Sequence, residues 1–180
     1  MMPIAKRLIA AALVLVSGCD RHGTGTADAQ IDADNPLEMA ARQRGVVRGD
    51  ATSPVGVFER AHDLGRDAMC VVPDGAGQWR FAMTASFGTS LSCAAKGTIV
   101  RDRDGWRMRF AGHEGCEASV REEEEELRLP GQLPPECASL CPSRASLSGL
   151  RLPRASWSAA DARGLQIGDE RGIINRPCAG

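Results

Sequence analysis

Apolar and polar residues alternate over most of residues 68–129, and this alternation constrains the fold more than any other feature. In the clearest row, from Trp79 to Phe87, every odd-numbered position is apolar. Similar rows occupy residues 91–99, 106–110, 116–121 and 127–129. A repeat of two places successive side chains on opposite faces of a β-strand. The pattern predicts six strands in an antiparallel meander, with one face in the core and one in water.

Turn residues separate these rows. Asp104-Gly105 is the strongest hairpin signal, because an Asp-Gly pair accepts the positive φ angles of a type I′ turn. Gly97, inside the second long row, indicates a bend. We therefore expect a half-open barrel rather than a flat sheet.

Short helices are expected to flank the sheet. Asn35 and Pro36 are typical of a helix start, and Gly45 of its end. The apolar spacing in residues 55–67 favours a second helix that ends at Gly65. Residues 136–141 form about one helical turn, and residues 143–152 and 156–165 are weakly amphipathic. The predicted class is α+β, mainly β, with one domain at residues 35–165 and a tail at 166–180 that is loose unless Cys178 holds it.

The chain has seven cysteines. Six of them are disulfide candidates: Cys70, Cys93, Cys116, Cys137, Cys141 and Cys178. They allow 15 pairings. Because Cys93 and Cys116 fall on inward rows, we expect them to pair, and Cys70 to join Cys137 or Cys141. No metal site is expected, because the three histidines are scattered and no C-x-x-C occurs.

The N-terminus has the organisation of a secretory signal. Lys6 and Arg7 precede an apolar run at residues 8–16, far shorter than the roughly 20 residues that span a bilayer. The next residues, Val16-Ser17-Gly18-Cys19, resemble the lipobox of bacterial lipoproteins. In that family the signal is cut between Gly18 and Cys19, the Cys19 thiol receives a diacylglycerol, and the new amino terminus is acylated.

This resemblance implies a signal peptide at residues 1–18 and a lipidated, flexible tether at residues 19–34. It places the protein in the bacterial envelope, anchored in a membrane and facing the periplasm. Asp20 resembles the signal that keeps enterobacterial lipoproteins in the inner membrane, which favours that membrane over the outer one. The domain also resembles small lipoproteins of alphaproteobacteria, a likeness that implies no activity. It is carried by Phe58-Glu59-Arg60, Gly65-Arg66-Asp67, Cys70-Val71-Val72, Cys141 and Arg144-Ala145-Ser146-Leu147.

Three features carry candidate chemistry. His113-Glu114-Gly115-Cys116 places an imidazole beside a thiol, but its glycines indicate a hairpin turn, so we assign no catalytic residue. The acidic run at residues 122–126 is interpreted as a solvated hairpin tip. The arginines on outward rows either form a basic stripe for an anionic partner or pair with acids across strands; they are Arg80, Arg107, Arg109 and Arg121.

The composition and the absence of common motifs exclude several classes of function. Without residues 1–18 the chain has 20 basic and 23 acidic residues, which argues against a nucleic-acid partner. P-loop, G-x-S-x-G and H-E-x-x-H motifs are absent, and no cofactor is expected. We expect a non-enzymatic envelope module that binds or scaffolds a protein or glycan.

Two alternatives remain open at this point. One is an inhibitor of an envelope hydrolase that acts through the loop at residues 112–115. Small β-barrel lysozyme inhibitors share the lipobox and the disulfides, but their tyrosines and Ser-Gly loop motif are not matched in this chain, which has no Tyr. The other alternative is a hydrolase that uses Cys116 with His113.

Overall fold

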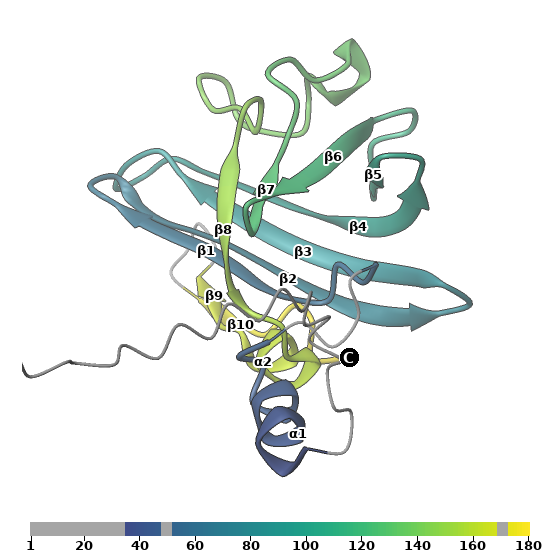
Figure 1. Ribbon diagram of the computed structural model, residues 1–180. Helices are drawn as coiled ribbons and strands as arrows, with labels where there is room; N and C mark the ends of the chain where they lie inside the picture. The colour runs from purple at the N-terminus through teal and green to yellow at the C-terminus, as the bar shows by residue number, and fades with distance from the viewer. Residues whose placement is uncertain (1–34, 48–51, 169–172) are drawn as a thin grey trace, which may run out of the picture. The chain divides into compact units, whose positions relative to one another are not determined.

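The computed structural model describes residues 35–47, 52–168 and 173–180. Within these residues the chain forms a closed antiparallel barrel, in which each strand pairs with the next and the last returns to the first (Figure 1). Its strands are β1 (Gly56–His62), β2 (Gly65–Gly75), β3 (Gln78–Ser86), β4 (Ser92–Asp102), β5 (Gly105–Phe110), β6 (Glu117–Glu123), β7 (Glu126–Arg128) and β8 (Arg151–Ser156). The predicted signal peptide, tether and lipidation site lie outside the described residues.

Short helices and a small second sheet accompany the barrel. Helix α1 (Pro36–Gln43) begins where predicted, and the Asn35 side chain accepts a hydrogen bond from the Leu37 N–H at 2.9 Å. A 3-10 turn, η1 (Pro135–Cys137), follows β7, and helix α2 (Ala159–Gly164) is capped by Ser158. Strands β9 (Ile167–Gly168) and β10 (Ile174–Asn175) pair with each other. The mainly-β class is confirmed.

The predicted six-stranded, half-open sheet is wrong, because the barrel has eight strands and is closed. One missed strand is β1, for which the sequence favoured a helix. Its inward row consists of Phe58 followed by two polar residues, Arg60 and His62, which bond the buried carboxylate of Asp67. Polar residues on the inward row removed the hydrophobic alternation that identifies a strand.

The other missed strand is β8, in a region expected to be weakly helical. Its inward positions are Leu152 and Arg154, and Pro153 lies between them on the outer side. A proline and an inward arginine are both unusual in a strand, so the pattern was hidden. Strand β8 pairs with β7 and, through Phe58↔Arg154, with β1. The two missed strands are therefore the ones that close the barrel.

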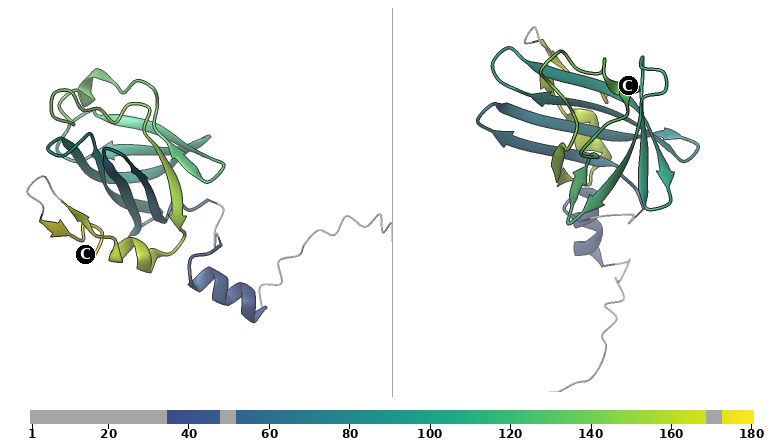
Figure 2. Two further views of the ribbon diagram at one scale, coloured as in Figure 1. Left: turned by 90° about the vertical axis from the view of Figure 1, so that its left-hand side faces the viewer. Right: turned by 90° about the horizontal axis from the view of Figure 1, so that it is seen from above.

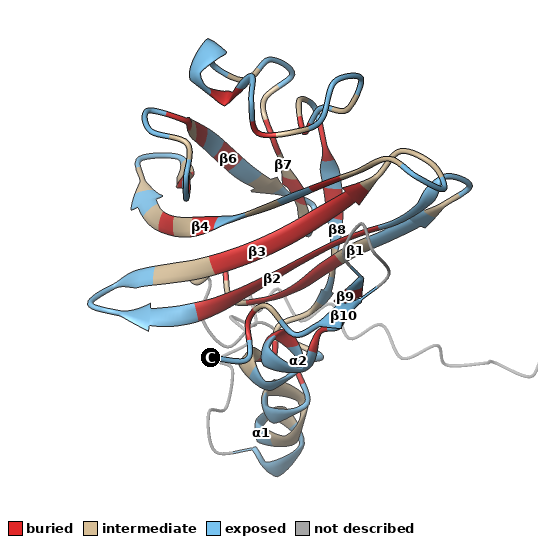
Figure 3. Ribbon diagram, turned by 180° about the vertical axis from the view of Figure 1, so that it is seen from behind, coloured by how far each residue is buried: buried red, intermediate tan, exposed pale blue. Residues whose placement is uncertain are grey.

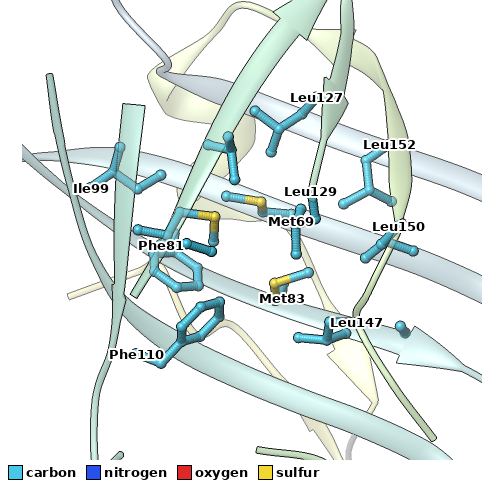
Figure 4. Close-up of a cluster of buried hydrophobic side chains, with 14 of the residues drawn as sticks. Met69, Phe81, Met83, Ile99, Phe110, Leu127, Leu129, Leu147, Leu150 and Leu152 are labelled. Atoms are coloured by element: carbon cyan, nitrogen blue, oxygen red, sulfur yellow. The ribbon is translucent and has the colours of Figure 1, made fainter. Parts of the chain in front are cut away.

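Side chains fill the interior of the barrel (Figure 4). Met69, Phe81 and Met108 are fully buried there, and Phe81 meets Phe110 edge-on with ring centroids 5.5 Å apart. The segment between β7 and β8 adds Leu140 and Leu147 to the same cluster. This segment therefore closes one end of the barrel.

The outer face of β1, β2 and β3 is also buried over part of its area. Outward residues of these strands, such as Cys70 and Val72, pack with Ala162 of α2, with Leu165 and with Ile167. Figure 2 shows α2, β9 and β10 together on this side of the barrel, and Figure 3 shows the buried middle of β2 and β3. The expectation that one face of the sheet is exposed to solvent is wrong for these strands, because the C-terminal segment covers their outer face.

The six candidate cysteines form three disulfides, Cys70–Cys178, Cys93–Cys141 and Cys116–Cys137. The prediction of disulfides is confirmed, but the expected pairs are wrong. Strand β5 separates Cys93 from Cys116, so each bonds to the segment that closes this end of the barrel. Cys70 points outward, away from that segment, and meets Cys178 in the C-terminal region. That bond holds the region that was expected to be loose without it.

The predicted β4–β5 hairpin forms, but its glycine has another role. The loop residues are Arg103 and Asp104, while Gly105 begins β5 opposite Asp102. A Cβ atom at Gly105 would lie 2.3 Å from the carbonyl oxygen of Val120. The glycine is needed for close approach of a neighbouring strand, and not for a positive φ.

Candidate functional site

The structure does not bring Cys116 and His113 together as a nucleophile and a base. Cys116 is bonded to Cys137 and is 1% exposed. The His113 Nδ1 atom lies 3.1 Å from Ser139 Oγ, and the His113 backbone closes the β5–β6 hairpin. A thiol in a disulfide has no thiolate to attack a substrate. The hydrolase alternative therefore lacks its nucleophile.

A buried ionic cluster that the sequence reasoning missed joins β1, β2 and β3. The Asp67 carboxylate is 2% exposed and accepts hydrogen bonds from Arg60 Nη2 at 2.7 Å and the Ser86 N–H at 2.9 Å. His62 Nε2 lies 3.0 Å from it, and His62 Nδ1 lies 3.2 Å from the Leu64 N–H. Because Nδ1 accepts from a backbone donor, Nε2 carries the proton and donates to Asp67. Both ring nitrogens are engaged, so this cluster is structural.

Asp67 should make folding sensitive to acid. Burial alone raises the pKa of Asp67, but hydrogen bonds from His62, Ser86 and Arg60 outweigh it, so the pKa lies below its usual value. A lowered folded-state pKa gives stability that is present above the unfolded value and lost as the pH falls through the folded value. We expect Asp67→Asn to lower the free energy of unfolding by about 2 kcal/mol at neutral pH.

Urea unfolding at neutral pH and at about pH 3 tests this prediction, since an unfolded Asp titrates near pH ~3.9. The difference between the variant and the wild type should shrink in acid, because the unfolded wild-type carboxylate takes up a proton there, whereas the folded one resists protonation. Asp74→Asn is a matched control in an exposed position. An equal loss for Asp67→Asn at both pH values would contradict a stabilising charge at this position.

Three of the four outward arginines pair with acids and so do not form an uncompensated basic stripe, whereas Arg121 forms no ion pair with another described residue. Arg107 lies 2.9 Å from Asp102, Arg109 lies 2.9 Å from Glu117, and Arg80 lies 3.9 Å from Asp74. These pairs favour the interpretation that the outward arginines pair with acids across strands on a solvent-exposed face. The acidic run is also partly compensated, since Arg128 pairs with Glu123 and Glu126.

Glu122, the first residue of the acidic run, lies inside the barrel rather than at a solvated tip. Arg154 Nε donates to Glu122 at 2.7 Å, and the two side chains are 1% and 5% exposed respectively. The guanidinium lies between two aromatic rings, 4.0 Å from the centroid of Phe58 and 3.5 Å from that of Trp157. Arg154 Nη1 also donates to the Val55 carbonyl at 2.9 Å. This pair is therefore part of the core.

An open groove of about 320 Å³ lies mainly on the outer surface of β3 and β4, and we call it the outer-face groove. Three of its lining residues, Met83, Ala95 and Leu140, belong to or pack against the core cluster of the barrel. The β5–β6 loop and the C-terminal residues supply its walls. The described residues that line it are mostly apolar and include no acid: Ala82, Met83, Ala94, Ala95, Lys96, Ala111, His113, Leu140, Ile167, Gly168, Asn175 and Pro177. The groove is the strongest candidate for a binding site.

A second pocket, of about 350 Å³, is lined by hydroxyl groups and is called here the hydroxyl pocket. It shares Ile167 and Gly168 with the outer-face groove, so the two flank β9. Its charged residue, Arg66, is paired with Glu59. The hydroxyls come from Thr84, Ser86, Thr89, Ser90 and Ser92. The outer-face groove could not be predicted from the sequence, because its lining combines residues from 82–83 to 175–177 that are far apart along the chain.

In the described part of the chain, no helix is long and apolar enough to cross a membrane. The same residues include no group of three or more His, Cys, Asp or Glu side chains that could hold a metal ion. No family model matches the sequence, and neither the search of curated proteins nor that of solved structures found a match. We therefore infer function from the geometry of the site.

Proposed function

We propose that this chain is a lipid-anchored lipoprotein of the bacterial envelope and acts as a non-enzymatic binding module that faces the periplasm. Its partner is an envelope component, a protein or a glycan, and not a nucleic acid. The observation that carries the proposal is the contrast between the two sides of the barrel wall. Side chains fill the interior, whereas the outer-face groove and the hydroxyl pocket adjoin on the outside. A partner therefore binds to the outer wall.

Two further observations support this proposal. Three disulfides suit an oxidising compartment such as the periplasm. The groups best placed for acid–base or nucleophilic chemistry are already engaged, Cys116 in a disulfide and His62 through both ring nitrogens. The anchor itself rests on the lipobox resemblance at Cys19.

We expect Cys19→Ser to abolish lipidation and to release the protein from membranes or leave an uncut precursor. The acyl chains hold the protein on the bilayer, and stable anchoring needs two or more of them. Membrane fractionation with incorporation of labelled palmitate measures both effects. Asp20→Ser is the matched control, because it leaves the lipidated residue in place; it should stay acylated and move toward the outer membrane on a density gradient. Membrane retention of a correctly cut Cys19→Ser protein would contradict the anchor.

One observation favours inhibition of an envelope hydrolase as a second candidate function. The exposed β5–β6 loop is fixed by the Cys116–Cys137 disulfide and by the hydrogen bond from Cys116 N–H to the His113 carbonyl at 3.1 Å. A preformed loop binds an enzyme without a large ordering cost. Inhibition assays against lysozymes and other envelope hydrolases, with His113→Ala for comparison, separate this candidate from the first.

A further inference from the structure

We propose that the outer-face groove binds a single-chain anionic amphiphile, an apolar chain that ends in a carboxylate or a phosphate. The inference goes beyond the protein or glycan partner of the proposed function, because it gives the binding module a small amphiphilic ligand as well. It rests on the binding role and does not depend on the lipid anchor.

The apolar part of the groove suits a narrow chain. Its floor is formed by small outward side chains on adjacent strands, Ala82 of β3 and Ala94 of β4, and Leu140, Ile167 and Pro177 add apolar surface. Small-molecule sites in proteins begin at about 300 Å³, and this groove has about 320 Å³. Displacement of water from this apolar surface by an apolar chain is favourable, because it removes apolar area from water.

The polar part of the groove is cationic. Lys96 lies directly opposite Ala82 in the β3–β4 pairing and is exposed. It forms no ion pair within the described residues, in contrast to Arg80, Arg107 and Arg109 on the same outer surface. None of the described residues that line the groove is an acid, so the ammonium group has no fixed counter-ion among them. An anionic head group beside an apolar chain complements both properties together.

His113 is placed to assist the same head group. Its Nδ1 atom faces Ser139 Oγ, and its ring lines the groove together with Lys96. Because Nδ1 faces Ser139, Nε2 is the ring nitrogen that can donate a hydrogen bond to an anionic oxygen. The hydroxyl pocket is a weaker candidate for an anion, because Glu59 already compensates Arg66 there.

Calorimetric titration of the full chain carrying Cys19→Ser tests the ligand class. The probes are dodecanoate, dodecyl phosphate, dodecanol and dodecyltrimethylammonium, all below their micellar concentrations. We expect saturable binding of both anions with one site per chain, and binding of dodecanol and of the cation about fivefold weaker, the effect of one ion pair at a partly exposed site. A preference between dodecanoate and dodecyl phosphate distinguishes a free fatty acid from a phosphate-bearing lipid as the source.

Two substitutions test the location. Ala94→Trp fills the groove and should weaken binding of every probe by roughly tenfold or more, because the displaced chain loses its buried area. Lys96→Glu should weaken the two anions by roughly tenfold and leave dodecanol unchanged, because it replaces an attraction by a repulsion. Ala61→Trp in β1 and Arg121→Glu in β6 are matched controls at exposed strand positions away from the groove and should bind like the parent chain.

Three results would overturn the proposal: no saturable binding of either anion, equal affinity for dodecanol and dodecanoate, or unchanged binding in Ala94→Trp. Circular dichroism of each variant shows that it is folded, and Lys96→Glu gives an independent test if Ala94→Trp is not. These outcomes are separable from failure of the anchor, since Cys19 fractionation and the titration measure different parts of the chain.

Discussion

Replacing Cys70 and Cys178 together by serine should lower the free energy of unfolding by about 5 kcal/mol, more than loss of either other disulfide. A cross-link stabilises a protein mainly by restricting the unfolded chain, and the effect grows with the length of the closed loop. The bonded residues are 108 apart for Cys70–Cys178, 48 for Cys93–Cys141 and 21 for Cys116–Cys137. The same relation gives about 4 and about 3 kcal/mol for the shorter loops.

Urea unfolding of three double-serine variants measures this order. Removal of the Cys70–Cys178 bond should cost additional free energy of unfolding, because this bond holds the C-terminal residues over the outer face of β2. Reduction of all three bonds should leave the chain largely unfolded, since their sum is comparable to the typical total of 5–15 kcal/mol. A larger loss for the Cys116–Cys137 variant than for the Cys70–Cys178 variant would contradict this account of the stability.

Glu122→Ala should lower the free energy of unfolding by about 3–5 kcal/mol, because it leaves the guanidinium of Arg154 buried without its carboxylate. The arginine cannot move into water, since Phe58 and Trp157 lie on either side of it. Thermal and urea unfolding measure the loss. Glu123→Ala is the matched control, because Glu123 forms an exposed pair with Arg128. This substitution should lower the free energy of unfolding by at most about 1 kcal/mol.

The double variant Glu122→Leu with Arg154→Met should recover most of that loss. Apolar residues of similar volume often replace a buried ion pair at little cost in stability. Recovery would show that the loss in Glu122→Ala comes from an uncompensated charge rather than from a cavity. A Glu122→Ala protein as stable as Glu123→Ala would show that the pair is not buried in solution.

The sequence predicted those elements whose inward rows are apolar. Strands β3 to β7 and part of β2 follow from alternation, and α1 follows from the cap at Asn35 and the proline after it. The presence of disulfides was predicted from the six cysteines that remain when Cys19 is set aside, together with the expected secretory signal. These features are local, so a single sequence contains the information that specifies them.

Features that depend on distant residues could not be predicted in this way. Strands β1 and β8 were missed because Arg60, His62 and Arg154 occupy inward positions and are compensated by Asp67 and Glu122 elsewhere in the chain. The disulfide pairing depends on which strands are neighbours and on how the segment after β7 folds back. The outer-face groove needs the C-terminal residues to lie over β3 and β4, although Ala82 and Pro177 are far apart in the sequence.

The central claim is that this chain is a disulfide-locked envelope lipoprotein that binds a partner without catalysis. Peptide mapping by mass spectrometry of the unreduced, unlabelled protein from cell envelopes tests it most directly. The account predicts three linked peptide pairs, Cys70 with Cys178, Cys93 with Cys141 and Cys116 with Cys137, together with an N-terminal peptide acylated at Cys19. A free Cys116 thiol would contradict the account and restore a nucleophile beside His113, and an unmodified Cys19 would remove the anchor.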